Sequence, residues 1–224
     1  MGTKRNSRSN PSVVNTIRKT VDNQSRRGAR QRISGQLGSS TVLKGTELCT
    51  AFTVGINTNA IAGLIPLIAG VATNRAVYTF INVAKNYQKF LYKPGTHFRY
   101  QPTVGLNTAG TVYVAFIDNP EAIKDYTAAT GAVRLDMIKG QANLRSYPVW
   151  QEFTFPLTAT PRQRYFSTDV TTDYTSAEVL NRVCQGAFLY AIELPAVAAA
   201  DTMLGRPMLH VNLQLDELSA SPVT

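Results

Sequence analysis

Two runs of alternating side chains between residues 90 and 120 constrain the fold of this chain more than any other feature. The first run, 90–100, places aromatic residues at every second position and is interrupted by Pro94 and Gly95. The second run, 111–117, is apolar on both faces. β-branched and aromatic residues at a period of two are typical of β-strands, and an apolar second face indicates a strand covered on both sides. We therefore predict two strands here, the second of them buried.

Further strands and short helices follow from the same patterns along the chain. About seven strands with many turns favour an antiparallel β-sandwich. The stretch 60–72 contains Pro66 and two glycines and is predicted to be an apolar loop, and 130–144 stays ambiguous. Strands are predicted at 48–54, 147–157, 164–167, 187–194 and 209–216, and helices at 77–87, from Pro120 onward, and from a Thr175–Glu178 capping box to about Val183.

The charge distribution divides the 224 residues into two regions. Residues 1–44 hold ten Lys or Arg and one acidic residue, whereas residues 45–224 hold thirteen of each sign. The first region has no Phe, Tyr or Trp, so we predict a disordered basic arm on an electrically neutral domain. Such an arm would bind nucleic acid through its phosphates, without sequence preference. The predicted nucleic-acid-binding residues are Lys4, Arg5, Arg8, Arg18, Lys19, Arg26, Arg27, Arg30 and Arg32.

The residues that carry catalysis or metal binding in other proteins are few. The two histidines, His97 and His210, accompany no nucleophile elbow, zinc motif or phosphate loop, so we predict no enzyme activity. Cys49 and Cys184 lie in apolar runs and are predicted to be buried thiols rather than a disulfide or a zinc site. No apolar run is long enough to span a bilayer, and no membrane partner is predicted.

Carboxylates gather where the second strand ends. Asp118 and Glu121 are three residues apart, and Asp125 follows one helical turn later. Hard oxygen ligands at this spacing suit Ca²⁺ if a neighbouring subunit completes the coordination shell. The same residues also fit a helix start, with Asn119 as N-cap and acidic residues facing the positive end of the helix dipole. Both interpretations stay open from the residues alone.

Taken together, these stretches resemble the shell domain of the coat proteins of small icosahedral RNA viruses of the tombusvirus and sobemovirus kind. Phe98–Pro102 followed by Gly110–Asp118 is similar to that family's "Tyr-x-Pro … Gly-x-Val-x-x-Ala-x-x-Asp" run. The similarity covers most of residues 45–218. Other stretches that resemble the family are Val77–Tyr87, Tyr147–Phe155 with Trp150, and Gly205–Leu218.

The resemblance implies an eight-stranded antiparallel jelly roll with short inserted helices, spanning residues 45–224. Its subunits would self-assemble into an icosahedral shell in the host cell cytoplasm, and the arm, 1–44, would package the genome inside the virion. The implied genome is single-stranded RNA, and DNA stays open. A calcium pair between subunits would fall on Asp118 and on Glu121, which stands where the family has a second Asp.

Two other classes of function remain as alternatives. One is a viral nucleic-acid-binding protein that forms no capsid, such as a nucleoprotein or a silencing suppressor. The other is a carbohydrate-binding sandwich or an enzyme with an incidental basic tail, although the sequence shows no concave polar or aromatic site for a ligand. Particle size separates the capsid interpretation from both alternatives, because a capsid protein sediments as a megadalton particle.

Overall fold

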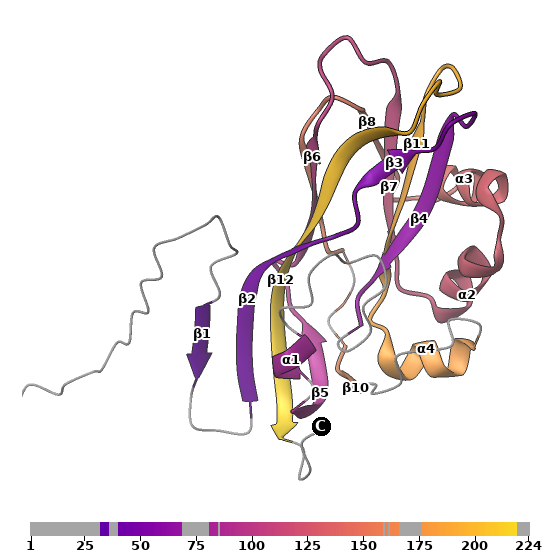
Figure 1. Ribbon diagram of the computed structural model, residues 1–224. Coiled ribbons are helices and arrows are strands. Elements are labelled where there is room, and N and C mark those ends of the chain that lie inside the picture. The colour runs from indigo at the N-terminus through magenta and orange to yellow at the C-terminus, as the bar shows by residue number, and fades with distance from the viewer. Residues whose placement is uncertain are drawn as a thin grey trace, which may run out of the picture.

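The protein is a sandwich of two antiparallel β-sheets with helices packed outside one of them (Figure 1). The predicted all-β class is confirmed. The computed structural model describes residues 32–35, 40–68, 81–84, 86–158, 160, 162–165 and 176–218.

The elements are short apart from one long strand near the C-terminus. The helices are α1 (Ile81–Ala84), α2 (Pro120–Ala128), α3 (Gly131–Lys139) and α4 (Ala177–Val183). None of the helices in the described residues is long and apolar enough to cross a membrane. The strands are β1 (Arg32–Gly35), β2 (Ser40–Leu48), β3 (Phe52–Val54), β4 (Ala60–Pro66), β5 (Tyr87–Tyr92), β6 (His97–Pro102), β7 (Thr111–Ile117), β8 (Arg145–Pro148), β9 (Phe153–Pro156), β10 (Arg164–Tyr165), β11 (Ala187–Glu193) and β12 (Thr202–Leu218).

Strand β12 organises the larger, eight-stranded sheet. It pairs with β2 and β3 along one edge and with β5 and β6 along the other, while β9 and β10 continue outward from β6 and β5. The strands β2 and β3, β5 and β6, and β9 and β10 therefore act as three interrupted strands. Together with β12 they form four adjacent strand positions in the sheet, and β1 adds an edge strand next to β2. The smaller sheet has the order β4-β11-β7-β8, so the eight-stranded jelly roll implied by the sequence is confirmed.

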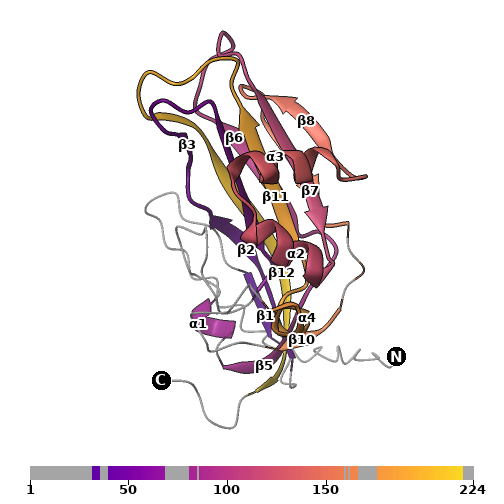
Figure 2. The ribbon, with the colours of Figure 1, turned by 90° about the vertical axis from the view of Figure 1, so that its right-hand side faces the viewer.

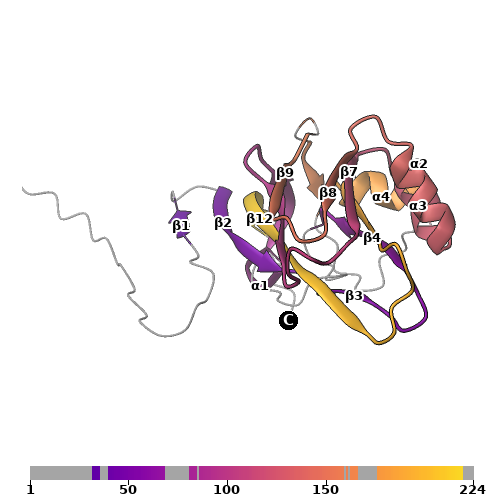
Figure 3. The same ribbon diagram turned by 90° about the horizontal axis from the view of Figure 1, so that it is seen from above.

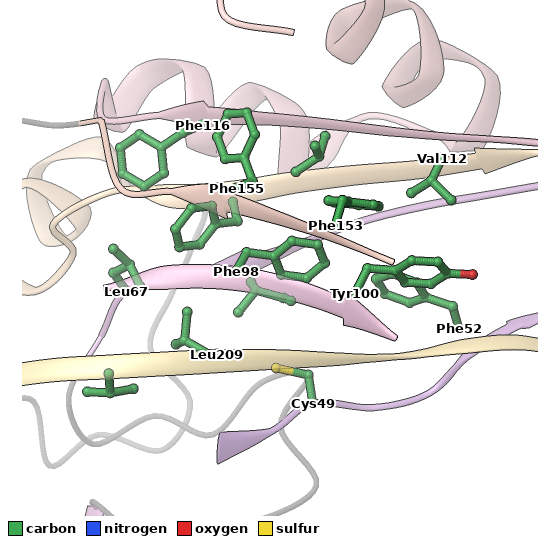
Figure 4. Close-up of a cluster of buried hydrophobic side chains, with 14 of the residues drawn as sticks. Cys49, Phe52, Leu67, Phe98, Tyr100, Val112, Phe116, Phe153, Phe155 and Leu209 are labelled. Carbon is green, nitrogen blue, oxygen red and sulfur yellow. The ribbon is translucent and has the colours of Figure 1, made fainter. Parts of the chain in front are cut away.

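Aromatic and aliphatic side chains together fill the space between the sheets (Figure 4). Phe188 of β11 lies within ring-contact distance of Phe98, Phe116 and Phe155, with centroid separations of 6.1, 5.1 and 6.2 Å. Such pairs add about 0.5–1.5 kcal/mol each beyond the free energy of burying their area. The period-two alternation of β6, β7, β9 and β12 supplies these residues, because every second side chain of a strand points to the same face.

A second apolar cluster lies between the four-stranded sheet and helices α2, α3 and α4 (Figure 2). Ile123 and Tyr126 of α2 and Ile138 of α3 are fully buried against it. The Tyr126 hydroxyl donates to Gly63 O of β4 at 3.1 Å, and its burial raises the pKa of this phenol. Strand β7 is therefore covered on both faces, as its doubly apolar pattern predicts, with Val112 and Val114 between the sheets.

Two amide side chains each bond both the backbone N–H and the backbone carbonyl of a residue in another segment. The Gln185 amide accepts from Tyr92 N and donates to Tyr92 O, both at 2.7 Å. Asn143 does the same for Phe116, accepting from its N–H at 3.4 Å and donating to its carbonyl at 2.7 Å. Gly186, at φ +146°, follows the first of these bridges, and a Cβ there would collide with the Phe116 ring and Ile117 O. The close approach of the chain to β7 just before β11 begins requires glycine at this position.

Two predicted elements differ in the structure. Residues 147–157 form two strands rather than one, because the chain turns at Val149 and passes from the smaller sheet (β8) to the larger (β9). The Tyr147 and Phe153 rings stack at 4.1 Å across this corner, so the alternation continues through it. The predicted loop over 60–66 is strand β4, whose apolar residues contribute to both clusters and so show no simple alternation.

The boundaries of several elements also shift. The predicted helix 77–87 ends at Ala84 in the described residues, and Tyr87 already begins β5. The cap of α4 is Ser176, whose hydroxyl accepts from Val179 N, whereas Thr175 lies outside the described residues. Strand β2 begins at Ser40 and buries Leu43, so the sandwich starts inside the segment predicted as arm. The arm residues 1–31 and 36–39 lie outside the described residues.

Candidate nucleic-acid and assembly interface

The predicted nucleic-acid-binding arm enters the sandwich at the edge of the larger sheet. Arg32 of β1 stands opposite Lys44 of β2 in the antiparallel register. The other predicted binding residues, from Lys4 to Arg30, lie outside the described residues, and their role stays a prediction. The structure thus gives the attachment point of the arm, on the sheet that lies away from helices α2 and α3 (Figure 3).

The carboxylate corner lies where β7 passes into α2. Asn119 caps the helix, with its Oδ1 accepting from Glu121 N at 3.0 Å, and Pro120 occupies the first turn. Glu121 forms an exposed ion pair with Lys124 at 2.5 Å, which raises the pKa of that lysine. The capping interpretation is confirmed for Asn119. It does not conflict with calcium, since Asp118 stays exposed at the same corner.

Positively charged side chains lie near Asp118. Arg164 of β10 donates from Nε to Cys184 O at 2.9 Å, and burial, together with the charge of Arg162, lowers its pKa despite the opposing effect of Asp118. Within the described residues, no three His, Cys, Asp or Glu side chains gather closely enough to hold a metal ion. The calcium site at this corner therefore stays a prediction.

The two histidines come together, which the sequence did not indicate. His97 of β6 is opposite His210 of β12, and their rings stack with centroids 4.4 Å apart. His210 Nδ1 lies 2.8 Å from the Thr46 hydroxyl, while its Nε2 is buried without a hydrogen-bond partner among the described residues. A hydroxyl beside an imidazole resembles half of a catalytic triad, but in this part of the chain no carboxylate orients the ring.

The cysteines are buried thiols, as predicted. Cys49 is 5% and Cys184 is 2% exposed, and neither forms a disulfide. They lie in different apolar clusters, Cys49 between the sheets and Cys184 under the helices. Cys184 Sγ donates to Gly186 O at 3.2 Å.

Comparison with solved structures identifies the architecture. No protein-family model matches the chain, and neither does any curated protein. A structure of Tobacco necrosis virus matches 88% of this chain and 90% of its own, with a TM-score of 0.69 and 16% identity. A Mud crab tombus-like virus structure matches 90% and 96%, with a TM-score of 0.62 and 13% identity. A Cocksfoot mottle virus structure matches 85% and 97%, with a TM-score of 0.60 and 12% identity.

The chain has the jelly-roll fold of icosahedral virus coat proteins. The resemblance inferred from the Phe98–Pro102 and Gly110–Asp118 segments is confirmed at the level of the fold. All three structures are viral, and the match spans most of each of the chains compared. At sequence identities of 12–16%, proteins can share a fold although their individual site residues differ.

Proposed function

We propose that this protein is the coat protein of an icosahedral virus, whose subunits self-assemble into a closed shell around the genome. The observation that supports this most strongly is the shared jelly-roll fold, which covers 85–90% of the chain in three virus structures. The second support is the charge distribution, in which residues 1–44 carry the whole net charge of +9. A neutral sandwich with a cationic arm separates two tasks, contact between subunits and neutralisation of a polyanion.

Sedimentation and electron microscopy of the purified full-length protein test the assembly. Closed particles in the megadalton range are expected at neutral pH, in the presence of single-stranded RNA. A protein that binds RNA and stays at the size of a monomer or dimer would instead be a nucleic-acid-binding protein without a capsid role. A protein that binds no RNA and forms no particle would refute the proposal altogether.

Genome packaging through the arm is tested by removing residues 1–34, which deletes nine cations from Lys4 to Arg32. Binding to single-stranded RNA should weaken, and the log–log dependence of affinity on salt should flatten by about 0.7 for each phosphate that the protein no longer neutralises. RNAs of different sequence should bind alike, because the arm contains no aromatic residue to stack on bases. An unchanged slope in the truncated protein would place the binding site on the sandwich.

We also propose that Asp118 and Glu121 bind Ca²⁺ at a boundary between subunits, with oxygens from the adjacent copy completing the shell. Both carboxylates are exposed, and carboxylate oxygens suit this ion. Chelation at neutral pH should then slow the sedimentation of the particles as they swell, and Ca²⁺ should reverse the change. Asp118→Asn should abolish the response, whereas Asp125→Asn, exposed one turn along α2, should retain it. Identical sedimentation in all samples would refute the calcium site.

A further inference from the structure

A groove on the outward face of the larger sheet holds the stacked histidines. It measures about 490 Å³ and opens between β2, β12 and the β5–β6 turn. Lys44 and Thr46 line it from β2, His97 from β6, and His210 and Asn212 from β12. Helices α2, α3 and α4 pack on the other sheet, so they leave this face uncovered (Figure 3).

The floor of the groove is held rigidly by Asn212. Its backbone carbonyl accepts from Lys93 N at 2.8 Å, its backbone N–H donates to the Thr96 hydroxyl at 3.1 Å, and its side chain donates to Pro94 O at 2.8 Å. Gly95, at φ +97°, closes the turn between these contacts. The turn at Pro94 and Gly95 is thus held rigidly beside the histidines. A rigid turn loses little conformational entropy when a ligand binds.

The groove is cationic in character. None of the residues that line it is acidic, and Lys44 is exposed at its rim. Outside the lining, Lys93 and Arg99 add positive charge, and two carboxylates are already hydrogen-bonded. Glu152 accepts from Arg99 Nε at 2.7 Å, and Asp216 accepts from Gln163 and Gln214.

His210 itself lacks an acceptor for a second proton among the described residues. Its Nδ1 is paired with Thr46, and its Nε2 is buried against His97 without a partner. Burial, then the neighbouring His97 and Arg99, lowers its pKa below the ordinary 6.5. A protonated His210 would gain an N–H that only an incoming acceptor could satisfy, after a small displacement of the His97 ring. An anion with several oxygens meets that requirement.

We propose that this groove binds a phosphate group of the packaged single-stranded nucleic acid, held by Lys44 and the His97–His210 pair. The position supports nucleic acid over a free anion, because Lys44 belongs to the predicted cationic segment 1–44 and is the register partner of Arg32 in the β1–β2 pairing. This inference rests on the proposed packaging function and extends it from the arm to the sandwich.

Carbethoxylation of imidazoles by diethyl pyrocarbonate reports on this groove alone, because the chain has only two histidines. Full-length subunits are treated with and without inorganic phosphate or a ten-nucleotide oligo-uridylate, and the peptides are quantified by mass spectrometry. Both ligands should slow modification of His97 several-fold at pH 6. Protection should weaken at pH 7.5, because anion binding is coupled to protonation of His210.

Matched variants connect this protection with the cation. Lys44→Gln should remove the protection and flatten the salt dependence of RNA binding by about 0.7. Arg182→Gln removes a charge from an exposed position on α4 and should change neither. His210→Gln, which leaves His97 in place, should lose the pH dependence of RNA affinity.

The remaining outcomes would overturn the proposal. Protection by phosphate alone would mean an adventitious anion site with no role in nucleic-acid binding. Protection by oligo-uridylate that survives Lys44→Gln would mean that RNA held by the arm shields the groove passively. Protection by neither ligand would exclude the site. In all three cases, particle formation and the arm-dependent salt slope measure the proposed capsid function independently, so a failure of the groove is distinguishable from a failure of that function.

Discussion

The two sheets of this sandwich are covered to different extents. The four-stranded sheet packs against the aromatic layer on one face and against α2, α3 and α4 on the other. The eight-stranded sheet shares the aromatic layer but turns its second face outward, where polar side chains such as His210, Asn212 and Gln214 follow one another along β12. One sheet therefore resembles the interior of the protein, and the other is half interior and half surface.

This difference separates stability from interaction. Strands covered on both faces must be apolar throughout, which leaves them no side chains for a partner. A strand with one open face can place any polar residue at every second position without disturbing the core. The attachment of the arm, the histidine pair and the groove all lie on the half-open sheet, so changes in the covered sheet should affect folding and changes on the open face should affect binding.

Phe188→Ala should have the largest effect, because this side chain is 1% exposed and contacts three other aromatic rings. A decrease of about 3–5 kcal/mol in the free energy of unfolding is expected from the forfeited transfer energy and the cavity. Urea unfolding of dissociated subunits measures it, with Phe188→Leu as a milder variant if the first fails to fold. Gln101→Ala on the open face should change stability by less than about 0.5 kcal/mol. Equal decreases at both positions would contradict the contrast between the sheets.

Gln185→Leu tests the amide that connects the sheets. The Tyr92 N–H and carbonyl would each be deprived of a buried hydrogen bond of 2.7 Å while the side-chain volume is nearly kept. We expect the free energy of unfolding to fall by about 2–3 kcal/mol. Gln163→Leu is the matched control, since its amide bonds Asp216 at an exposed position and its effect should be small. A neutral Gln185→Leu would show that packing of the apolar layer alone holds the two sheets together.

Tyr126→Phe tests how the helices are held on the covered sheet. It removes the hydroxyl that donates to Gly63 O and, at 3.4 Å, to Tyr190 O. The free energy of unfolding should fall by about 1–2 kcal/mol, because a buried carbonyl is left without its donor. Tyr113→Phe, whose half-buried hydroxyl donates to Glu193 at 3.3 Å, should cost less. The reverse order in urea unfolding would argue that the hydroxyl of Tyr126 is not part of the packing.

His210→Gln should have the smallest effect, and only in acid. The native pKa of His210 is lowered from 6.5, so below that pH the unfolded chain binds more protons than the native one. Stability from this residue is therefore complete above pH 6.5 and disappears as the pH falls through the native pKa. Unfolding at pH 7.5 and 5.5 should show a smaller acid destabilisation in His210→Gln than in the wild type. Equal destabilisation would mean that the pKa of His210 does not differ between the native and the unfolded chain.

Much of the fold could be predicted from local patterns. The strands around 90–100, 111–117, 187–193 and 209–216 follow from period-two alternation, and Pro120 marked the start of α2. The strand β4 could not be predicted in this way, because covering on both faces removes the alternation and its Gly63 and Pro66 resemble loop residues. The candidate site could be predicted from the sequence only in part. The cationic arm is visible in composition, and the Asp118 corner in spacing.

The sequence by itself determined which segments are strands, which side of each is apolar, and where the charge is concentrated, because these depend on neighbours within a few residues. Only the tertiary structure decided which segments meet. His97 and His210 are 113 positions apart, yet they stack because β6 and β12 pair in one particular register. Likewise, Gln185 reaches Tyr92 only because the two sheets close over the aromatic core. Register and sheet packing are set by the whole core at once, so no short stretch of sequence records them.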